Sequence, residues 1–286
     1  MYQSSYSVTM ADTRQPPGLF FTSINPSAEV TIVFLHGLFC SHLEFNLVLP
    51  HLKDYHLLLV DLPSHSRSHA SHSGPFTLAN CAARVANLIL THANNARAHI
   101  VGVSGGGFVG MHLATQHPEL VTSLFVSGAT PFQGYQRWLA THPQALYPLL
   151  AATTTWPSDY LYRWVTTRMG LLAHEELHAE SKANFSFELV KLGYSQLAGF
   201  TLEDSIPSLA EAGVRTLVLA GEVVDDARTA KSMGRLLREN GSPESEAVLV
   251  KGAQHLWDLQ FPLLFAESIK AWVERRVLPD GLKKLS

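Results

Sequence analysis

The sequence predicts an α/β fold in which a mostly parallel central sheet is flanked by helices. Short apolar runs of strand length alternate along the chain with segments of helical periodicity, which is typical of a wound α/β sheet. The runs are continuously apolar, as expected for parallel strands that are covered on both faces. The predicted strands are residues 31–35, 56–60, 98–103, 120–126, 216–220 and 247–250, and the predicted helices are residues 78–92, 108–117, 228–240 and 262–277.

The N-terminal region predicts an antiparallel addition to this sheet. Two strand-like segments, SYSVTM and GLFFTSI, are separated by RQPPG, whose prolines and glycine favour a turn. We therefore expect a hairpin at one edge of the sheet.

One long stretch interrupts the alternation of strands and helices. No strand-like run occurs between residues 131 and 205, and prolines are expected to divide this stretch into short helices. These prolines are Pro143, Pro148 and Pro157. We predict a core formed by residues 1–130 and 206–286, with residues 131–205 inserted as a helical lid.

The predicted lid is rich in aromatic residues, which is typical of a cover over an apolar pocket. Three of the five tryptophans of the chain lie in it, at positions 138, 156 and 164. Large side chains are also needed to bury enough area in a small helical layer. We predict that Trp138, Trp156 and Trp164 contact the substrate.

Composition and charge exclude several classes of function. The chain has 286 residues, 46% of them hydrophobic, and a formal net charge of −3, with its 21 Lys and Arg residues scattered. This argues against a nucleic-acid surface or a basic membrane patch. Two cysteines are too few for a disulfide framework, and neither a signal peptide nor a membrane-spanning run is seen. We expect a cytoplasmic protein whose partner is a small apolar molecule, and we leave its oligomeric state open, with a homodimer as one option.

The most informative motif is the segment GVSGG at residues 102–106. It follows a predicted strand and precedes a predicted helix, which is the context of a nucleophile elbow. The tight turn exposes the hydroxyl of Ser104, and the flanking glycines avoid clashes with neighbouring backbone. The sequence therefore predicts that Ser104 is a catalytic nucleophile.

A serine hydroxyl needs a base, and His255 is the best placed of 15 histidines. It follows the strand at 247–250 by a short loop, so it is expected at the same sheet edge as Ser104. An acid should orient the imidazole. Four residues near the strand at 216–220 are candidates: Asp225 and Asp226, with Glu222 and the more remote Asp204 as alternatives. Asp226 is placed to cap the following helix, which favours Asp225.

Two backbone amides are predicted to stabilise a developing oxyanion. The first belongs to Gly105, directly after the predicted nucleophile, and the second to Leu38, in the loop after the strand at 31–35. Phe39 directly follows Leu38, and Leu256 directly follows His255. We expect both side chains to line the substrate site.

The chain resembles an α/β-hydrolase from about residue 31 to residue 277. The residues that carry the resemblance are HGL at 36–38, DLP at 61–63, the Ser104 elbow, residues 221–225 and His255. The resemblance implies Ser104 as nucleophile, Asp225 as acid, His255 as base, and Leu38 with Gly105 as the oxyanion hole, with neither cofactor nor metal. The chain is most similar to small lidded esterases, C–C bond hydrolases and fungal secondary-metabolism hydrolases.

Two positions depart from the family pattern. Serines and histidines (SHSRS) follow the DLP motif, where the family usually has glycines. Gly105 replaces a residue that is often larger, which predicts extra space beside the nucleophile.

A second motif, HEELH at residues 174–178, matches the zincin pattern, but no convincing third ligand follows it. We interpret it as a solvated amphipathic helix of the lid. The loop that contains His65, His69 and His72 is interpreted as a polar surface loop.

The leading functional hypothesis is a serine hydrolase that cleaves an uncharged, largely apolar ester, lactone or thioester by acyl-enzyme chemistry. A C–C bond hydrolase, or a lyase or cyclase acting on a diketone or natural-product intermediate, uses the same residues. A ligand-binding protein without catalysis is a third hypothesis, disfavoured by the complete triad.

Overall fold

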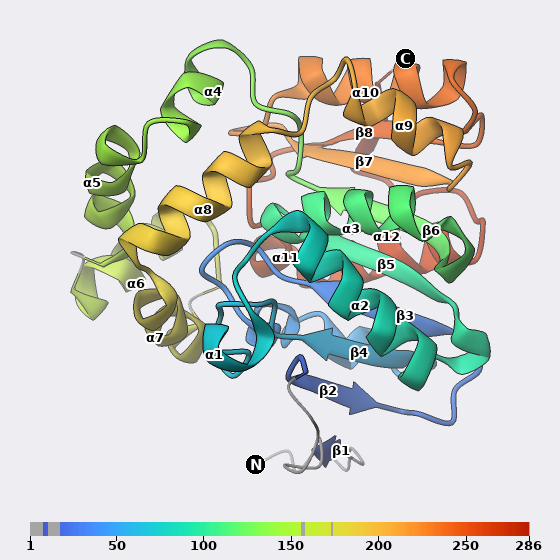
Figure 1. Ribbon diagram of the computed structural model, residues 1–286, viewed down its shortest axis with the longest axis horizontal. Helices are drawn as coiled ribbons and strands as arrows, with labels where there is room; N and C mark the ends of the chain where they lie inside the picture. The colour runs from blue at the N-terminus through green and yellow to red at the C-terminus, as the bar shows by residue number, and fades with distance from the viewer. Residues whose placement is uncertain (1–7, 11–17, 156–157, 173, 286) are drawn as a thin grey trace.

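The computed structural model describes residues 8–10, 18–155, 158–172 and 174–285. Within these residues the chain forms a nine-stranded sheet with the strand order β1-β2-β4-β3-β5-β6-β7-β8-β9 (Figure 1). The strands are β1 (Val8–Met10), β2 (Phe21–Ile24), β3 (Thr31–Leu35), β4 (His56–Val60), β5 (Ala98–Val103), β6 (Val121–Ser127), β7 (Thr216–Gly221), β8 (Glu246–Val250) and β9 (Leu282–Lys284). The six strands β3 to β8 are parallel, whereas β1, β2 and β9 are antiparallel additions at the edges. The predicted, mostly parallel sheet is confirmed.

Helices cover both faces of this sheet, which explains why its central strands are apolar throughout. Every residue of β3, β4 and β7 is buried. One face packs against α2 (Leu78–His92), α3 (Gly105–Gln116), α9 (Ser205–Glu211) and α10 (Ala227–Glu239). The other face packs against η1 (His42–Phe45), η2 (Leu49–His51), α11 (Trp257–Gln260) and α12 (Pro262–Val273). Three short elements, α1 (Ala70–Ser73), η3 (Asn94–Ala96) and η4 (Pro118–Leu120), lie in connections.

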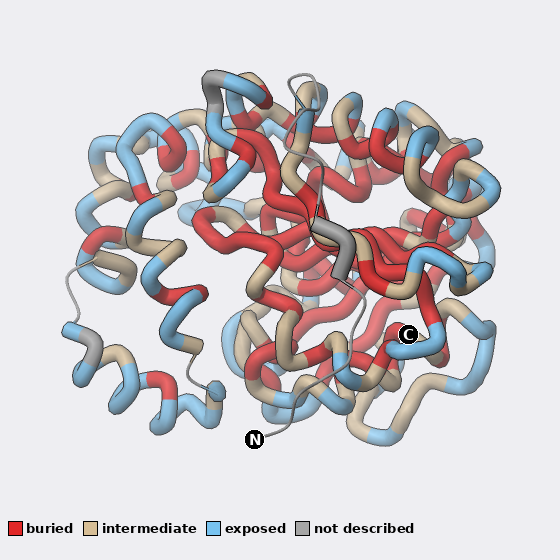
Figure 2. Tube along the Cα trace, turned by 90° about the horizontal axis from the view of Figure 1, so that it is seen from below, coloured by how far each residue is buried: buried red, intermediate tan, exposed pale blue. Residues whose placement is uncertain are grey.

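Five helices are inserted between β6 and α9, off the end of the sheet (Figure 1). They are α4 (Gly134–Ala140), α5 (Pro143–Thr154), α6 (Asp159–Arg168), α7 (Glu175–Asn184) and α8 (Phe187–Ala198). We call them the inserted helices. Figure 2 shows that they are far less buried than the sheet. Pro143 begins α5 as predicted, but Pro148 lies inside α5, so the prediction that it ends a helix is wrong. Pro157 lies outside the described residues.

No helix in the described part of the chain combines the length and the apolar composition needed to cross a bilayer.

The start of α3 is packed against the end of β3 without room for a side chain. A Cβ atom at Gly106 would lie 2.0 Å from the carbonyl oxygen of Leu35 and 2.7 Å from that of His36. Backbone atoms of a central strand cannot move aside without breaking the sheet. This contact therefore requires glycine, and it brings the turn after β5 beside the loop after β3.

We expect Gly106→Ala to destabilise the protein by more than about 3 kcal/mol, because the new methyl group overlaps backbone. Gly199→Ala is the matched control, since its Cβ atom would lie 3.4 Å or more from any neighbour and the φ angle of Gly199 is −74°. The control should change stability by less than about 1 kcal/mol. Urea unfolding measures both values, and equal stability of the two variants would contradict the proposed backbone contact.

Candidate active site

Ser104 occupies the sharp turn between β5 and α3. Its backbone has a φ angle of 50° and a ψ angle of −118°, a conformation that costs a non-glycine residue on the order of 1–3 kcal/mol. The amide of Ser104 donates a hydrogen bond of 2.8 Å to the carbonyl oxygen of Ser127, at the end of β6. The side chain is partly exposed. The strained turn therefore presents the hydroxyl at the carboxyl edge of the sheet.

The loop after β3 lies directly against this turn. A Cβ atom at Gly37 would lie 3.5 Å from Cβ of Ser104, and one at Gly105 would lie 3.1 Å from the amide nitrogen of Leu38. The amides of Leu38 and Gly105 have no hydrogen-bond acceptor among the described residues. The two amides that were predicted to stabilise an oxyanion are therefore adjacent and uncommitted.

Three other amides of this loop are bonded. Gly37 donates to Oε2 of Glu44 at 2.8 Å, and Phe39 donates to Nε2 of His65 at 3.0 Å. Cys40 donates to the carbonyl oxygen of Gly37 at 3.1 Å. Side chains thus hold the loop and leave the amide of Leu38 unpaired.

Two buried histidines brace this region by backbone contacts. His36 donates from Nδ1 to the carbonyl oxygen of Gly37 and accepts at Nε2 from the amide of Leu62. His65 donates from Nδ1 to the carbonyl oxygen of Pro63, so its Nε2 is the acceptor for Phe39. Burial lowers the pKa of His36 and lowers that of His65 to about 3. Both rings are neutral, as an acceptor nitrogen requires.

The interpretation of this histidine-rich segment as a polar surface loop is wrong for His65. That side chain is fully buried, as are Ser68 and Ser73. Ser64 and Ser66 have φ angles of 67° and 43°, at positions where the family resemblance predicts glycines. The serines adopt the left-handed conformation that glycine favours. A string of polar residues carries no periodicity from which such burial can be predicted.

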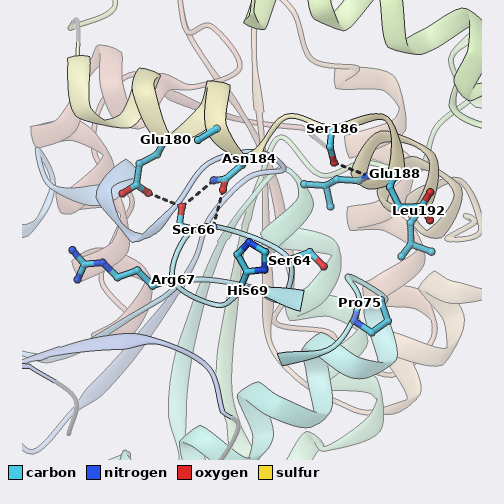
Figure 3. A pocket seen from close by; sticks show the side chains of 12 residues that line it. Ser64, Ser66, Arg67, His69, Pro75, Glu180, Asn184, Ser186, Glu188 and Leu192 are labelled. Atoms are coloured by element: carbon cyan, nitrogen blue, oxygen red, sulfur yellow. Dashed lines mark hydrogen bonds between the residues drawn. The ribbon is translucent and has the colours of Figure 1, made fainter. Parts of the chain in front are cut away.

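Asn184, the last residue of α7, connects the inserted helices to the loop after β3. Its Nδ2 atom donates to the carbonyl oxygens of Phe39 and Cys40, both at 3.0 Å, and its Oδ1 atom accepts from the amide of Ser66 at 2.7 Å. Ser66 in turn donates from Oγ to Glu180. Figure 3 shows the hydrogen bonds among Ser66, Glu180 and Asn184 beside a pocket of about 630 Å³ between residues 64–75 and helices α7 and α8. Sequence reasoning missed Asn184, because no motif contains it.

The structure brings His255 and Asp225 together across the ends of β7 and β8. Nδ1 of His255 lies 2.6 Å from Oδ1 of Asp225, whose other carboxylate oxygen accepts from the amide of Gly221 at 2.7 Å. Burial alone lowers the pKa of His255, but the hydrogen bond and charge of Asp225 outweigh it and raise the pKa. Because Nδ1 faces a carboxylate, it carries the proton, and Nε2 keeps its lone pair.

The imidazole of His255 lies over Gly128, the residue that follows β6. A Cβ atom at Gly128 would lie 2.7 Å from Cε1 of His255, and the φ angle of Gly128 is 62°. Glycine is therefore required there for space and for conformation. Ser127, the residue before Gly128, accepts the hydrogen bond from the amide of Ser104. The imidazole of His255 therefore lies at the end of the strand that neighbours Ser104. Adjacent strands are about 4.8 Å apart.

The other three acids considered for His255 have different partners. Asp226 caps α10 by accepting from the amides of Arg228 and Thr229. Glu222 accepts from the amide of Gly252 at 2.8 Å. Asp204 accepts from the hydroxyl of Thr201 in an exposed turn. Asp225 alone among the four contacts His255.

Aromatic and aliphatic side chains surround the loop after β3. Phe39 is buried, and its ring lies 5.1 Å from that of Phe185 and 6.5 Å from that of Tyr194, between ring centroids. Phe132, after β6, stacks on Tyr194 at 6.1 Å. Leu256 is partly buried in a cluster with Cys40 and residues of α7 and α11.

Two of the three tryptophans that were predicted to contact the substrate lie among the described residues. Trp138 and Trp164 are 46% and 49% exposed, and their rings contact His142 and Arg168 rather than residues around Ser104. Trp156 lies outside the described residues. The structure does not bring the two described indoles to the serine.

The extra space expected beside Ser104 is already filled. A Cβ atom at Gly105 would lie 3.0 Å from Cγ of Leu38. The Leu38 side chain also packs on Gly193 of α8, where an added Cβ atom would lie 3.1 Å from it. The small residue in the turn accommodates Leu38 instead of opening a cavity.

The HEELH segment begins a helix with one exposed and one buried side, since Glu175 and Glu176 are exposed whereas Leu177 and His178 are buried. His174 caps α7 by accepting from the amide of Leu177, and His178 is buried, with its ring stacked 3.7 Å from Tyr162. Among the described residues, no group of three His, Cys, Asp or Glu side chains is arranged to hold a metal ion.

Two buried carboxyl groups beside the site were not predicted. Glu44 in η1 and Asp258 in α11 are both fully buried. In the described part of the chain, Oε1 of Glu44 and both carboxylate oxygens of Asp258 lack hydrogen-bond partners. Burial raises the pKa of Asp258 to about 7, and burial together with Asp258 raises that of Glu44. At neutral pH the pair therefore retains at least one proton.

Comparison with known proteins gives consistent results. A model of the alpha/beta hydrolase family matches residues 32–268. An AB hydrolase superfamily protein of Gibberella zeae is 31% identical over 98% of this chain and 91% of its own length. The pimeloyl-[acyl-carrier protein] methyl ester esterase of Yersinia pseudotuberculosis is 28% identical over 86% of this chain and 94% of its own. The structure of MenH from S. aureus superimposes with a TM-score of 0.70, at 17% identity, over 90% of this chain and 98% of that one.

We expect Asp258→Asn to raise the melting temperature more at pH 8 than at pH 5. The folded protein holds a proton on Asp258 up to about pH 7, whereas an unfolded aspartate loses it near pH 4. The stability of the wild type therefore falls as the pH rises through this window, and the amide variant lacks that loss. Asp280→Asn, at an exposed site, should keep the wild-type pH dependence. Identical pH profiles for all three proteins would contradict the assignment.

Proposed function

Because this chain belongs to the alpha/beta hydrolase family, we propose that it is a serine hydrolase acting on an uncharged, largely apolar ester, lactone or thioester. The observation that carries the proposal is the convergence of four groups at one sheet edge. They are the strained serine turn, the His255–Asp225 pair, and the two unpaired amides of Leu38 and Gly105. Acyl transfer needs a nucleophile, an oriented base and oxyanion donors, and these groups supply all three.

In the proposed mechanism Ser104 attacks the substrate carbonyl carbon as Nε2 of His255 takes the hydroxyl proton. Asp225 holds the ring by its Nδ1–H group and stabilises the imidazolium that forms. The imidazolium then protonates the departing alcohol or thiol, which leaves an ester between the acyl group and Ser104. Water, deprotonated by the same nitrogen, attacks this ester and regenerates the hydroxyl of Ser104.

The negative oxygen of each tetrahedral intermediate is proposed to lie between the amides of Leu38 and Gly105. The amide of Leu38 is held before substrate binds, since Glu44, His65 and Asn184 bond to the backbone of its two neighbours. The amide of Gly105 follows Ser104, whose own amide is bonded to Ser127. Preorganised donors cost no reorganisation during the reaction, and one such donor is worth on the order of 100-fold in rate.

The preference for apolar substrates rests on the side chains next to these amides. Leu38, Phe39, Phe132 and Tyr194 are uncharged and lie where the inserted helices meet the sheet edge. We propose that residues 131–205 act as a lid over this region. The Yersinia relative is named for hydrolysis of a methyl ester, which is consistent with an ester substrate.

Ser104→Ala should remain folded and lose turnover by on the order of a millionfold. A fluorophosphonate probe should label the wild type at Ser104, as peptide mass spectrometry can establish, and should not label the variant. The substrates are short and medium acyl esters, lactones and thioesters. Residual activity above a few per cent of the wild type, on a good substrate, would overturn the proposed mechanism.

A matched pair of variants tests the assignment of the acid. Asp225→Asn should fold normally and lose about ten-thousandfold in kcat, because the imidazole is no longer oriented or stabilised. Asp226→Asn should stay active and lose well under about 1 kcal/mol of stability, because the amide oxygen of asparagine can still cap α10. Activity is measured as kcat and stability by urea unfolding, and the reverse pattern would assign the acid to Asp226.

A further inference from the structure

Tyr194, on α8, has a hydroxyl group with no partner beside the proposed site. It makes no hydrogen bond to any described residue, although the side chain is only partly exposed and packs against the main apolar core. This hydroxyl is not one of the buried polar atoms that lack a partner, so a molecule that enters the site can reach it. An accessible phenol that is bonded to no described residue is available to donate a hydrogen bond to a ligand.

The contacts of the ring place Tyr194 beside the loop that carries Leu38. The ring stacks on Phe132, with 14° between the planes, and also neighbours Phe39 of the loop after β3. Gly193, the preceding residue, packs on the side chain of Leu38. Tyr194 is thus next to the residue whose amide is one of the proposed oxyanion donors.

The phenol is a neutral donor at physiological pH. Burial raises its pKa to about 12, and no charged group contributes to that shift. Because no charged side chain contributes to that shift, we take an uncharged oxygen atom as the acceptor for this hydroxyl.

We propose that Tyr194 is a specificity-determining residue whose hydroxyl donates a hydrogen bond to a second oxygen of the substrate, remote from the scissile carbonyl. The preferred substrates are then apolar esters, lactones or thioesters that also carry a ketone, ether or hydroxyl oxygen. This inference rests on the proposed function and narrows its substrate class. A substrate with a plain hydrocarbon chain leaves the phenol unpaired and binds less favourably in the transition state.

The test compares Tyr194→Phe with the wild type on matched pairs of p-nitrophenyl esters. Each pair consists of a plain acyl chain and the same chain with one ketone, and the ketone is moved along the chain from pair to pair. The wild type should favour at least one oxo ester over its plain partner. Tyr194→Phe should lower the ratio of kcat/KM for that oxo ester to kcat/KM for its plain partner by about tenfold.

Tyr160→Phe is the control, because that side chain is 79% exposed on α6 and its hydroxyl faces water. It should alter neither member of any pair. Equal losses on plain and oxo esters in Tyr194→Phe would assign the residue to packing alone. The absence of any ketone-dependent loss would likewise overturn the inference.

Ser104→Ala, assayed in the same series, separates the two proposals. If it is inactive while Tyr194→Phe treats both ester types alike, the substrate inference fails and the serine mechanism stands. If it retains turnover, the proposed function fails whatever Tyr194 does.

Discussion

The backbone contact between the start of α3 and the end of β3 is the constraint on which the site depends. Gly106 lies so close to the carbonyl oxygen of Leu35 that no side chain fits between them. This contact brings the turn of Ser104 beside the loop that carries Leu38, although about 65 residues separate the two in the sequence. A hydroxyl and two unpaired amides therefore meet at one point without any flexible side chain having to reach it.

Buried neutral polar groups then hold this arrangement in place. His36 and His65 each use one ring nitrogen as donor and the other as acceptor, so they connect the loops after β3 and β4 without adding charge. A neutral imidazole satisfies two backbone groups in a region where an ion is costly to bury. Asn184 adds a connection from the inserted helices to the same loop, so movement of α7 must disturb the backbone beside Leu38.

The site also concentrates the features that oppose stability. Ser104 has a strained backbone, and among the described residues the amides of Leu38 and Gly105 and both carboxylate oxygens of buried Asp258 have no partner. Elsewhere the central strands of the sheet are packed with apolar side chains. Local conflict of this kind is expected where a protein keeps groups available for a ligand, and the surrounding core compensates for its cost.

The sequence by itself determined the six parallel strands, the four helices α2, α3, α10 and α12, and the position of the serine turn, but not β9, α9 or α11. Those features follow from local periodicity and from glycines at the turn, and both are visible along the chain. It also narrowed the acid to four residues, with Asp225 preferred because Asp226 was placed to cap α10. The tertiary structure places Asp225 on the ring of His255 and Asp226 on the helix.

Only the tertiary structure decided which polar residues are buried and which aromatic rings face outward. The burial of His65, Glu44 and Asp258 depends on contacts between distant loops, which no local pattern encodes. Trp138 and Trp164 turned out to be half exposed, because aromatic composition does not specify the face of a helix that meets the core. Tyr194 is one aromatic residue among many in the sequence, and only the tertiary structure places its ring beside Phe39 and Phe132.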